Sequence, residues 1–191
     1  MVAKHQPRFW RCGADGLSRY RARCDGGTSG AQRHRHWQGR VRFWRISHRK
    51  YALDRLRAGA ALFGGRWNVI GMPALYCATA VALCVIEKFV HVERTPLPPL
   101  ALVAVDVPDH HTLYEPGIAA LPARWDDLLT SATAQLFGGT WLASRTNLAM
   151  KVPSAIVKEE FNVIINPLHP DYRDVQLSII RPFTFDSRMF K

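Results

Sequence analysis

GGRWNVIGMPALYCATAVALCVIE, residues 64–87, predicts a Gly-rich turn, a short apolar strand and the start of a helix. The strand is PALYCA (73–78), and the helix covers ATAVALCVIEKFVHVE (78–93). Three side chains suited to chemistry follow one another here: Arg66 in the turn, Tyr76 in the strand and Glu87 in the helix. This stretch is therefore the first place to look for a functional site.

Outside this stretch, apolar runs predict five more strands. In the first, alternation places Phe43 and Arg45 on one face and Trp44 and Ile46 on the other. The second is bounded by prolines and has no polar break before Asp106, which is typical of a buried strand. The five strands are VRFWRI (41–46), LALVAVDV (100–107), LAMKV (148–152), FNVIIN (161–166) and VQLSII (175–180).

Two further segments have helical composition. YALDRLRAG (51–59) predicts one or two helical turns that end at Gly59. WDDLLTSATAQLF (125–137) predicts a helix that Gly138 and Gly139 terminate. Two or three helices among about six strands, with hairpin-length links late in the chain, favour an α+β fold over a doubly wound sheet.

Charge and composition separate residues 1–40 from residues 41–191. The chain has 191 residues and a formal net charge of +11, of which the first forty residues supply +7. They are rich in Arg, Gly, Ser and His without helical or strand periodicity, which predicts a disordered basic extension. Two alternatives are a nucleic-acid-binding arm and a non-native stretch ahead of an alternative start codon at Val41. Residues 41–191 are the predicted domain.

Cysteine and histidine usage predicts a cytoplasmic protein without a metal. The four cysteines form no disulfide framework, which fits a reducing compartment. No N-terminal apolar signal region is visible, and the run ATAVALCVI (78–86) is too short to span a bilayer. The histidines lack a metal-ligand spacing.

Each candidate residue also has an ordinary structural interpretation. Arg66 follows two glycines that could expose backbone N–H groups to phosphate. Neither a Walker loop nor GxGxxG is present, and an arginine after two glycines is more often part of a surface turn. Glu87 has largely apolar helix neighbours, which suggests a cation or ligand beside it, or it is an exposed acid at the helix edge. Ser154 follows a strand, where serines often cap turns, and no GxSxG elbow surrounds it.

Taken together, the motifs resemble the RES domain, a bacterial toxin family named for an arginine, a glutamate and a serine. The resemblance runs from about residue 41 to the C-terminus, whereas residues 1–40 have no counterpart. Its elements are FWRI (43–46), GGRWN (64–68), ALYCA (74–78), the helix with Glu87, VPSAIV (152–157), NVIINP (162–167) and FTFDSRMF (183–190), the last as a closing strand.

The resemblance implies an ADP-ribosyltransferase-like fold, with a mixed or antiparallel sheet flanked by helices, that acts on NAD as substrate. It implies no bound cofactor, although inorganic phosphate is a co-substrate in phosphorolysis. The implied partner is an Xre-like antitoxin, with a homodimer as one arrangement of the complex, and no direct contact with nucleic acid or membrane is expected.

The family's motif residues also imply roles for five positions. Glu87 would stabilise the oxocarbenium-like state at the ribose. Arg45 and Arg66 would clamp the pyrophosphate, or hold an attacking phosphate. Tyr76 would flank the nicotinamide, and Ser154 would bind the ribose or position Glu87.

Three functions follow from these observations. The first is a toxin that depletes NAD by hydrolysis or phosphorolysis at the nicotinamide–ribose bond. The second is a mono-ADP-ribosyltransferase that uses the same residues on a protein acceptor. The third is a basic nucleic-acid-binding module that uses residues 1–40 and scattered tryptophans.

Overall fold

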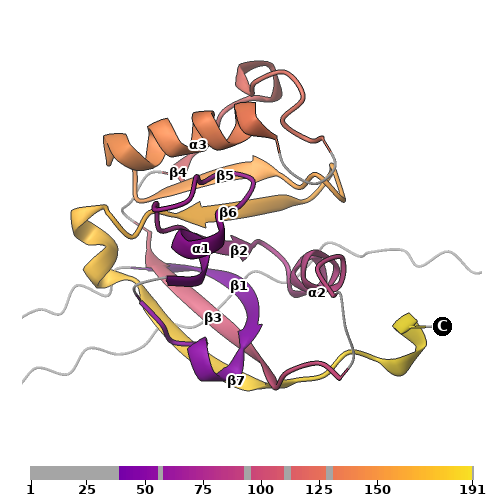
Figure 1. Ribbon diagram of the computed structural model, residues 1–191. Helices are drawn as coiled ribbons and strands as arrows, with labels where there is room; N and C mark the ends of the chain where they lie inside the picture. Colours follow the sequence, from indigo (N-terminus) through magenta and orange to yellow (C-terminus); the bar gives the residue numbers. More distant parts are fainter. Residues whose placement is uncertain (1–38, 56–57, 93–95, 110–112, 128–130, 191) are drawn as a thin grey trace, which may run out of the picture. The chain divides into compact units, whose positions relative to one another are not determined.

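The computed structural model describes residues 39–55, 58–92, 96–109, 113–127 and 131–190 (Figure 1). The predicted N-terminal extension, residues 1–40, lies outside this part except for Gly39 and Arg40. Arg40 already belongs to the first strand, where it pairs with Pro108. In the described ranges, no helix combines the length and the apolar character that crossing a membrane requires.

A seven-stranded sheet is the centre of the fold, in the order β4-β5-β6-β2-β1-β3-β7. The pair β4/β5 is parallel and the other pairs are antiparallel, so the sheet is mixed. The predicted α+β class is confirmed. The strands are β1 (Arg40–His48), β2 (Leu75–Ala78), β3 (Leu100–Pro108), β4 (Leu113–Tyr114), β5 (Ala149–Pro153), β6 (Phe161–Ile165) and β7 (Gln176–Phe183).

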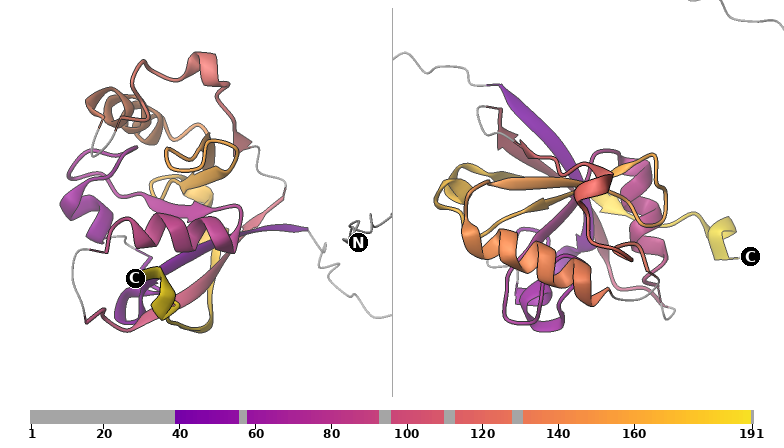
Figure 2. Two further views of the ribbon diagram at one scale, coloured as in Figure 1. Left: turned by 90° about the vertical axis from the view of Figure 1, so that its right-hand side faces the viewer. Right: turned by 90° about the horizontal axis from the view of Figure 1, so that it is seen from above.

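In the described part of the chain, three α-helices and four short 3-10 segments accompany the sheet. Helix α3 runs beside β5 and β6, and α2 lies next to β2 (Figures 1 and 2). The α-helices are α1 (Ala58–Phe63), α2 (Val81–Phe89) and α3 (Ala132–Ser144). The 3-10 segments are Arg49–Tyr51, Ile118–Ala120, Pro170–Asp174 and Ser187–Phe190.

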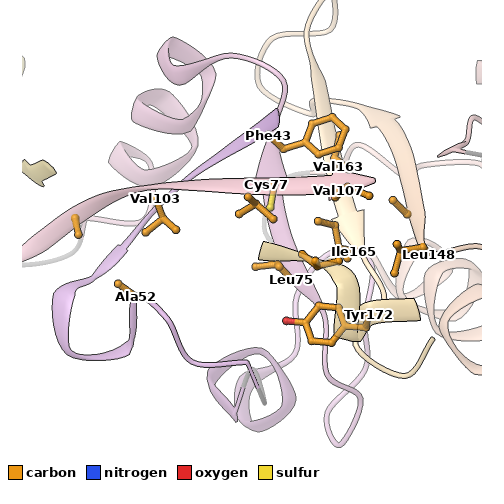
Figure 3. Packing of buried hydrophobic residues seen from close by; sticks show 14 residues of the cluster. Phe43, Ala52, Leu75, Cys77, Val103, Val107, Leu148, Val163, Ile165 and Tyr172 are labelled. Atoms are coloured by element: carbon orange, nitrogen blue, oxygen red, sulfur yellow. The ribbon is translucent and has the colours of Figure 1, made fainter. Parts of the chain in front are cut away.

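Side-chain alternation gives the sheet two buried faces. On one face, a cluster that includes Phe43, Leu75, Val163 and Ile165 packs against Tyr172 (Figure 3). The opposite face is covered by helices. Trp141 and Leu142 of α3 pack on β5 and β6, while Leu83 and Cys84 of α2 pack on β1, β2 and β3. The apolar residues that alternate along the strands therefore supply both layers of the core.

The predicted helix over 51–59 is wrong in position. A 3-10 turn occupies Arg49–Tyr51, and the described α-helix is Ala58–Phe63, so Gly59 lies inside it. The helix ends where Gly64 adopts a φ of 70° and donates its N–H to the Ala60 carbonyl at 2.9 Å. Gly64, rather than Gly59, therefore supplies the left-handed conformation that stops a helix.

The predicted helix over 125–137 is also shifted. Ser131 caps α3 by accepting a hydrogen bond from the Ala134 N–H at 3.2 Å. The helix then continues through Gly138 and Gly139 and ends at Ser144, followed by the cap residue Arg145, whose φ is 53°. A Cβ on Gly138 would lie 2.2 Å from the Trp67 carbonyl oxygen, so this glycine permits close packing and does not end the helix.

The predicted closing strand FTFDSRMF (183–190) is mostly not a strand. Phe183 is the last residue of β7, and Ser187–Phe190 form a 3-10 turn. Phe185 and Phe190 leave the sheet and make edge contacts with Phe89 of α2, at ring-centroid distances of 5.8 and 5.3 Å. Aromatic packing against the helix replaces strand pairing here.

Candidate active site

Glu87, Ser154 and Asn162 form one hydrogen-bonded group between α2 and the sheet. Glu87 lies in the last turn of α2, Ser154 follows the final residue of β5, and Asn162 is the second residue of β6. Val152 of β5 pairs with Asn162, which brings the end of β5 beside the start of β6. The Ser154 hydroxyl donates to Glu87 Oε1 at 2.8 Å, and Asn162 Nδ2 donates to the same oxygen at 2.5 Å.

The Ser154 hydroxyl has its direction set by its own turn. Its Oγ accepts hydrogen bonds from the backbone N–H groups of Ile156 and Val157, at 3.0 and 3.1 Å. Those two donors occupy the acceptor side of the oxygen, so its single hydrogen points to Glu87. The side chain is fully buried. Ser154 thus caps the turn and also holds the carboxylate, and the two interpretations of this serine are compatible.

Tyr76 fixes the turn that carries Arg66. Its hydroxyl donates to Asn68 Oδ1 at 2.7 Å and accepts the Trp67 N–H at 2.9 Å. A Cβ on Gly65 would lie 2.6 Å from this hydroxyl, so glycine is needed for the close approach. Burial raises the pKa of Tyr76 above its usual range, so the phenol stays protonated.

Asn68 completes the same turn from inside. It is fully buried, and its amide Nδ2 donates to the carbonyls of Ala60 and Met72, both at 2.8 Å. The turn is therefore tied to α1, to the residues before β2 and to the Tyr76 hydroxyl.

Arg66 is held by the loop that follows β4. Its Nη1 donates to the carbonyl oxygens of Trp125 and Asp127, at 2.7 and 2.8 Å. The Trp125 ring stacks on Trp67 with a centroid distance of 5.9 Å, which fixes the loop against the turn. Arg66 is half-buried, and two backbone carbonyls orient its guanidinium.

A surface ion pair joins this loop to the turn after Ser154. Lys158 Nζ lies 2.8 Å from Asp126 Oδ2. This hydrogen bond from Lys158 lowers the pKa of Asp126, and the Arg66 charge contributes in the same direction. The Arg66 loop and the Ser154 turn are thereby neighbours.

Arg45 lies on β1, next to Trp44, which pairs with Ala78 of β2. It is close enough to α2 for its charge to lower the pKa of Lys88, after the larger effect of burial on that lysine. Arg45 therefore adds positive charge near the end of α2.

The structure brings the five predicted residues together only in part. Glu87 and Ser154 are in direct contact, and the Tyr76 hydroxyl is hydrogen-bonded to the turn that carries Arg66. Among the described residues, no hydrogen bond joins these two groups. They share one face of the sheet, because Tyr76 pairs with Ile164, two residues along β6 from Asn162. Within that part of the chain, no cluster of three His, Cys, Asp or Glu side chains could hold a metal ion.

The sequence interpretation did not assign Asn68 or Asn162. Both lie inside quoted motifs, GGRWN and NVIINP, so the motifs located them without giving them roles. Alternation in β6 could have placed Asn162 on the same face as Ile164, but the contact with Glu87 depends on the position of α2.

The chemistry available here is that of an oriented carboxylate. Two donors on one oxygen hold Glu87, and the cations Arg45, Lys88 and Arg66 belong to surrounding elements. A fixed carboxylate can stabilise a developing positive charge, and the arginines can bind phosphate oxygens.

Comparisons with known proteins agree with the motifs. The family model described as "RES domain" matches residues 42–186. A Sphingobium protein named "Prs ADP-ribosylating toxin" is 38% identical over 156 residues, which cover 78% of this chain and 96% of that protein. A Photorhabdus laumondii protein named "Toxin Res" is 36% identical over 151 residues, with the same two coverages.

A solved structure shares the fold. The crystal structure of the MbcT–MbcA toxin–antitoxin complex of M. tuberculosis contains a chain that matches with a TM-score of 0.60 at 17% identity. The match covers 80% of this chain and 88% of that one.

Proposed function

Because the chain belongs to the RES domain family, we propose that it is the toxin of a toxin–antitoxin pair and cleaves the nicotinamide–ribose bond of NAD. The names of two relatives, at 38% and 36% identity, support a toxin, and one of those names describes ADP-ribosylation. Both NAD hydrolysis and ADP-ribosyl transfer begin by breaking the same bond. That shared step is the basis of the proposal.

The orientation of Glu87 carries this proposal. Loss of nicotinamide leaves a positively charged, oxocarbenium-like ribose, which a fixed carboxylate stabilises. Glu87 is held at Oε1 by Ser154 and Asn162, so little reorganisation is needed when the charge develops. Glu87 is the catalytic residue in this scheme, and Ser154 either positions it or contacts the ribose.

The remaining residues bind the dinucleotide. Arg66 donates from Nη1 to two loop carbonyls, which orients the guanidinium, and its other N–H groups would bind the pyrophosphate. Arg45 contributes a second cation beside α2 and would hold inorganic phosphate if phosphate is the nucleophile. Tyr76 offers its ring to the nicotinamide, since its hydroxyl is already used by the turn. No resident cofactor takes part.

ADP-ribosylation of a protein is the second candidate. The name of the Sphingobium relative favours it, and the same carboxylate would serve, with an acceptor side chain in place of water or phosphate. In either case we propose that an Xre-like antitoxin neutralises the toxin in the cytoplasm by covering this site. A homodimer within that complex is part of the proposal.

Product analysis separates these reactions. The full chain is incubated with NAD labelled in the adenylate part, with and without phosphate. Free ADP-ribose indicates hydrolysis, its 1″-phosphate indicates phosphorolysis, and label on protein of an added cell extract indicates transfer.

Glu87→Gln should lower kcat by roughly 100- to 1000-fold with little change in KM, because the charge matters most in the transition state. The control is Glu115→Gln, which makes the same change at an exposed acid paired with Lys151. Near-native turnover by Glu87→Gln would overturn the assignment.

A further inference from the structure

Glu87 has an asymmetric set of hydrogen bonds. Ser154 Oγ and Asn162 Nδ2 both donate to Oε1, at 2.8 and 2.5 Å. In the described part of the chain, no side chain or backbone group donates to Oε2. Within the described residues, the protein thus binds one oxygen of the carboxylate, and the other oxygen could face a ligand.

The two donors to Oε1 belong to different parts of the fold. Ser154 belongs to the turn after β5, and its hydroxyl is aimed by backbone N–H groups of that turn. Asn162 belongs to β6, where it pairs with Ala78 of β2 on one side and with Val152 of β5 on the other. Asn162 is thus attached to the interior of the sheet, whereas Ser154 depends on a loop.

A second donor matters because a carboxylate turns easily. The terminal torsion of a glutamate side chain is broad, so a single hydrogen bond leaves Oε2 free to swing about Oε1. Donors from two directions restrict that rotation. A displacement of about 1 Å in a catalytic group can cost roughly 100-fold in rate, so losing this restriction should lower kcat.

We propose that Asn162 is a positioning residue that, together with Ser154, fixes Oε1 and directs Oε2 of Glu87 toward the bound ribose. The inference rests on the proposed catalytic role of Glu87. Asn162 acts only through Glu87 and does not itself contact the reacting atoms. It adds to the site a residue that neither the arginine–glutamate–serine pattern nor the sequence interpretation included.

Asn162→Asp is the sharpest variant. It keeps the size of the side chain, removes the N–H donor and puts a second carboxylate against Oε1. Two carboxylates at hydrogen-bond distance do not both ionise readily, so one proton is retained to higher pH. We expect kcat for NAD to fall by roughly 100-fold near neutral pH, with the acid limb of the pH–rate profile displaced upward by about one unit or more. KM should change little.

Asn162→Val is the second variant, in case the paired carboxylates unfold the protein. Valine suits a strand and lacks both donor and charge. It should lower kcat by roughly 10- to 100-fold. Because it removes a donor to the carboxylate without adding a second charge, it should displace the acid limb upward less than Asn162→Asp does. Asn147→Asp is the matched control, because Asn147 lies in the turn between α3 and β5 and bonds only Thr146 among the described residues. It should behave as the wild type does.

The outcomes separate the two levels of the argument. If the wild type consumes NAD and Glu87→Gln does not, wild-type kcat and pH profile in both Asn162 variants would overturn the positioning role alone. If Glu87→Gln is as active as the wild type, the proposed function and the positioning role both fall. A lowered melting temperature with kcat intact would show that Asn162 is merely structural and would also reject the inference.

Discussion

Replacing Gly138 by alanine tests whether this glycine is required by packing. The added Cβ would lie 2.2 Å from the Trp67 carbonyl oxygen and 2.8 Å from its carbonyl carbon, where ordinary contacts are 3.4–4 Å. The obstacle is backbone, so no side-chain rotation relieves it, and α3 must move from the Trp67 turn. Overpacking costs about 1–3 kcal/mol, and the upper end applies to a backbone clash.

The higher helix propensity of alanine stabilises α3 by about 1 kcal/mol relative to glycine and so offsets part of that cost. The expected net loss is about 2 kcal/mol in the free energy of unfolding. For a chain of this size it corresponds to a melting temperature lower by roughly 4–8 °C. NAD turnover should fall as well, because Trp67 adjoins Arg66.

Urea unfolding and thermal melting of Gly138→Ala measure this loss, with Gly59→Ala as the control. Gly59 is also helical, but a Cβ there would meet nothing within 4 Å. Gly59→Ala should therefore raise the free energy of unfolding by about 0.4–1 kcal/mol. Replacing glycine by alanine should thus lower the free energy of unfolding in one helix and raise it in the other. A Gly138→Ala protein as stable as the wild type would refute the packing argument.

Two other side chains give further predictions. Tyr76→Phe should lower the free energy of unfolding by about 1–3 kcal/mol, because the Trp67 N–H and Asn68 Oδ1 lose their partner, whereas Tyr51→Phe, at an exposed ring, should have almost no effect in the same urea titration. Burial raises the pKa of the Cys84 thiol to about 12, so the native protein should not react with iodoacetamide at this position. Mass spectrometry of the peptide that contains Cys84 should show labelling at pH 8 only after denaturant is added. Labelling of Cys84 in the native protein would contradict this burial.

The strands were predictable because their signal is local. Apolar runs with β-branched residues, such as residues 100–107 and 161–166, became β3 and β6 with nearly the predicted bounds. The two-residue strand β4 was missed, since Leu113 and Tyr114 form no run and owe their assignment to pairing with β5. Short strands defined by a partner leave little trace in sequence.

The helix ends were not predictable because a glycine has several uses. Gly59, Gly64 and Gly138 look alike in sequence, yet one is an ordinary helical residue, one adopts a positive φ and one admits a neighbouring backbone. Which use applies depends on what packs against the residue. That information is tertiary and becomes available only when α3 and the Trp67 turn are placed together.

The site was predictable to the extent that motifs preserve geometry. Glu87 and Ser154 are 67 residues apart, and periodicity gave no reason to pair them, whereas the family pattern did. Asn162 stood in a quoted motif and was still overlooked, because an asparagine in a strand has no distinctive pattern. Its role emerges only from the hydrogen bond to Glu87.

The structure also changes how variants of this site should be interpreted. Tyr76 and Arg66 are each bonded to backbone that holds the Gly65 turn or the 125–127 loop, so their removal disturbs the fold as well as any ligand. Loss of activity in such variants therefore does not identify a chemical role. Glu87 differs, because a glutamine there preserves its size and can still accept the hydrogen bonds from Ser154 and Asn162 while the charge is lost. A fall in kcat at unchanged stability in Glu87→Gln would thus isolate the charge, which makes this residue the decisive one for a claim about mechanism.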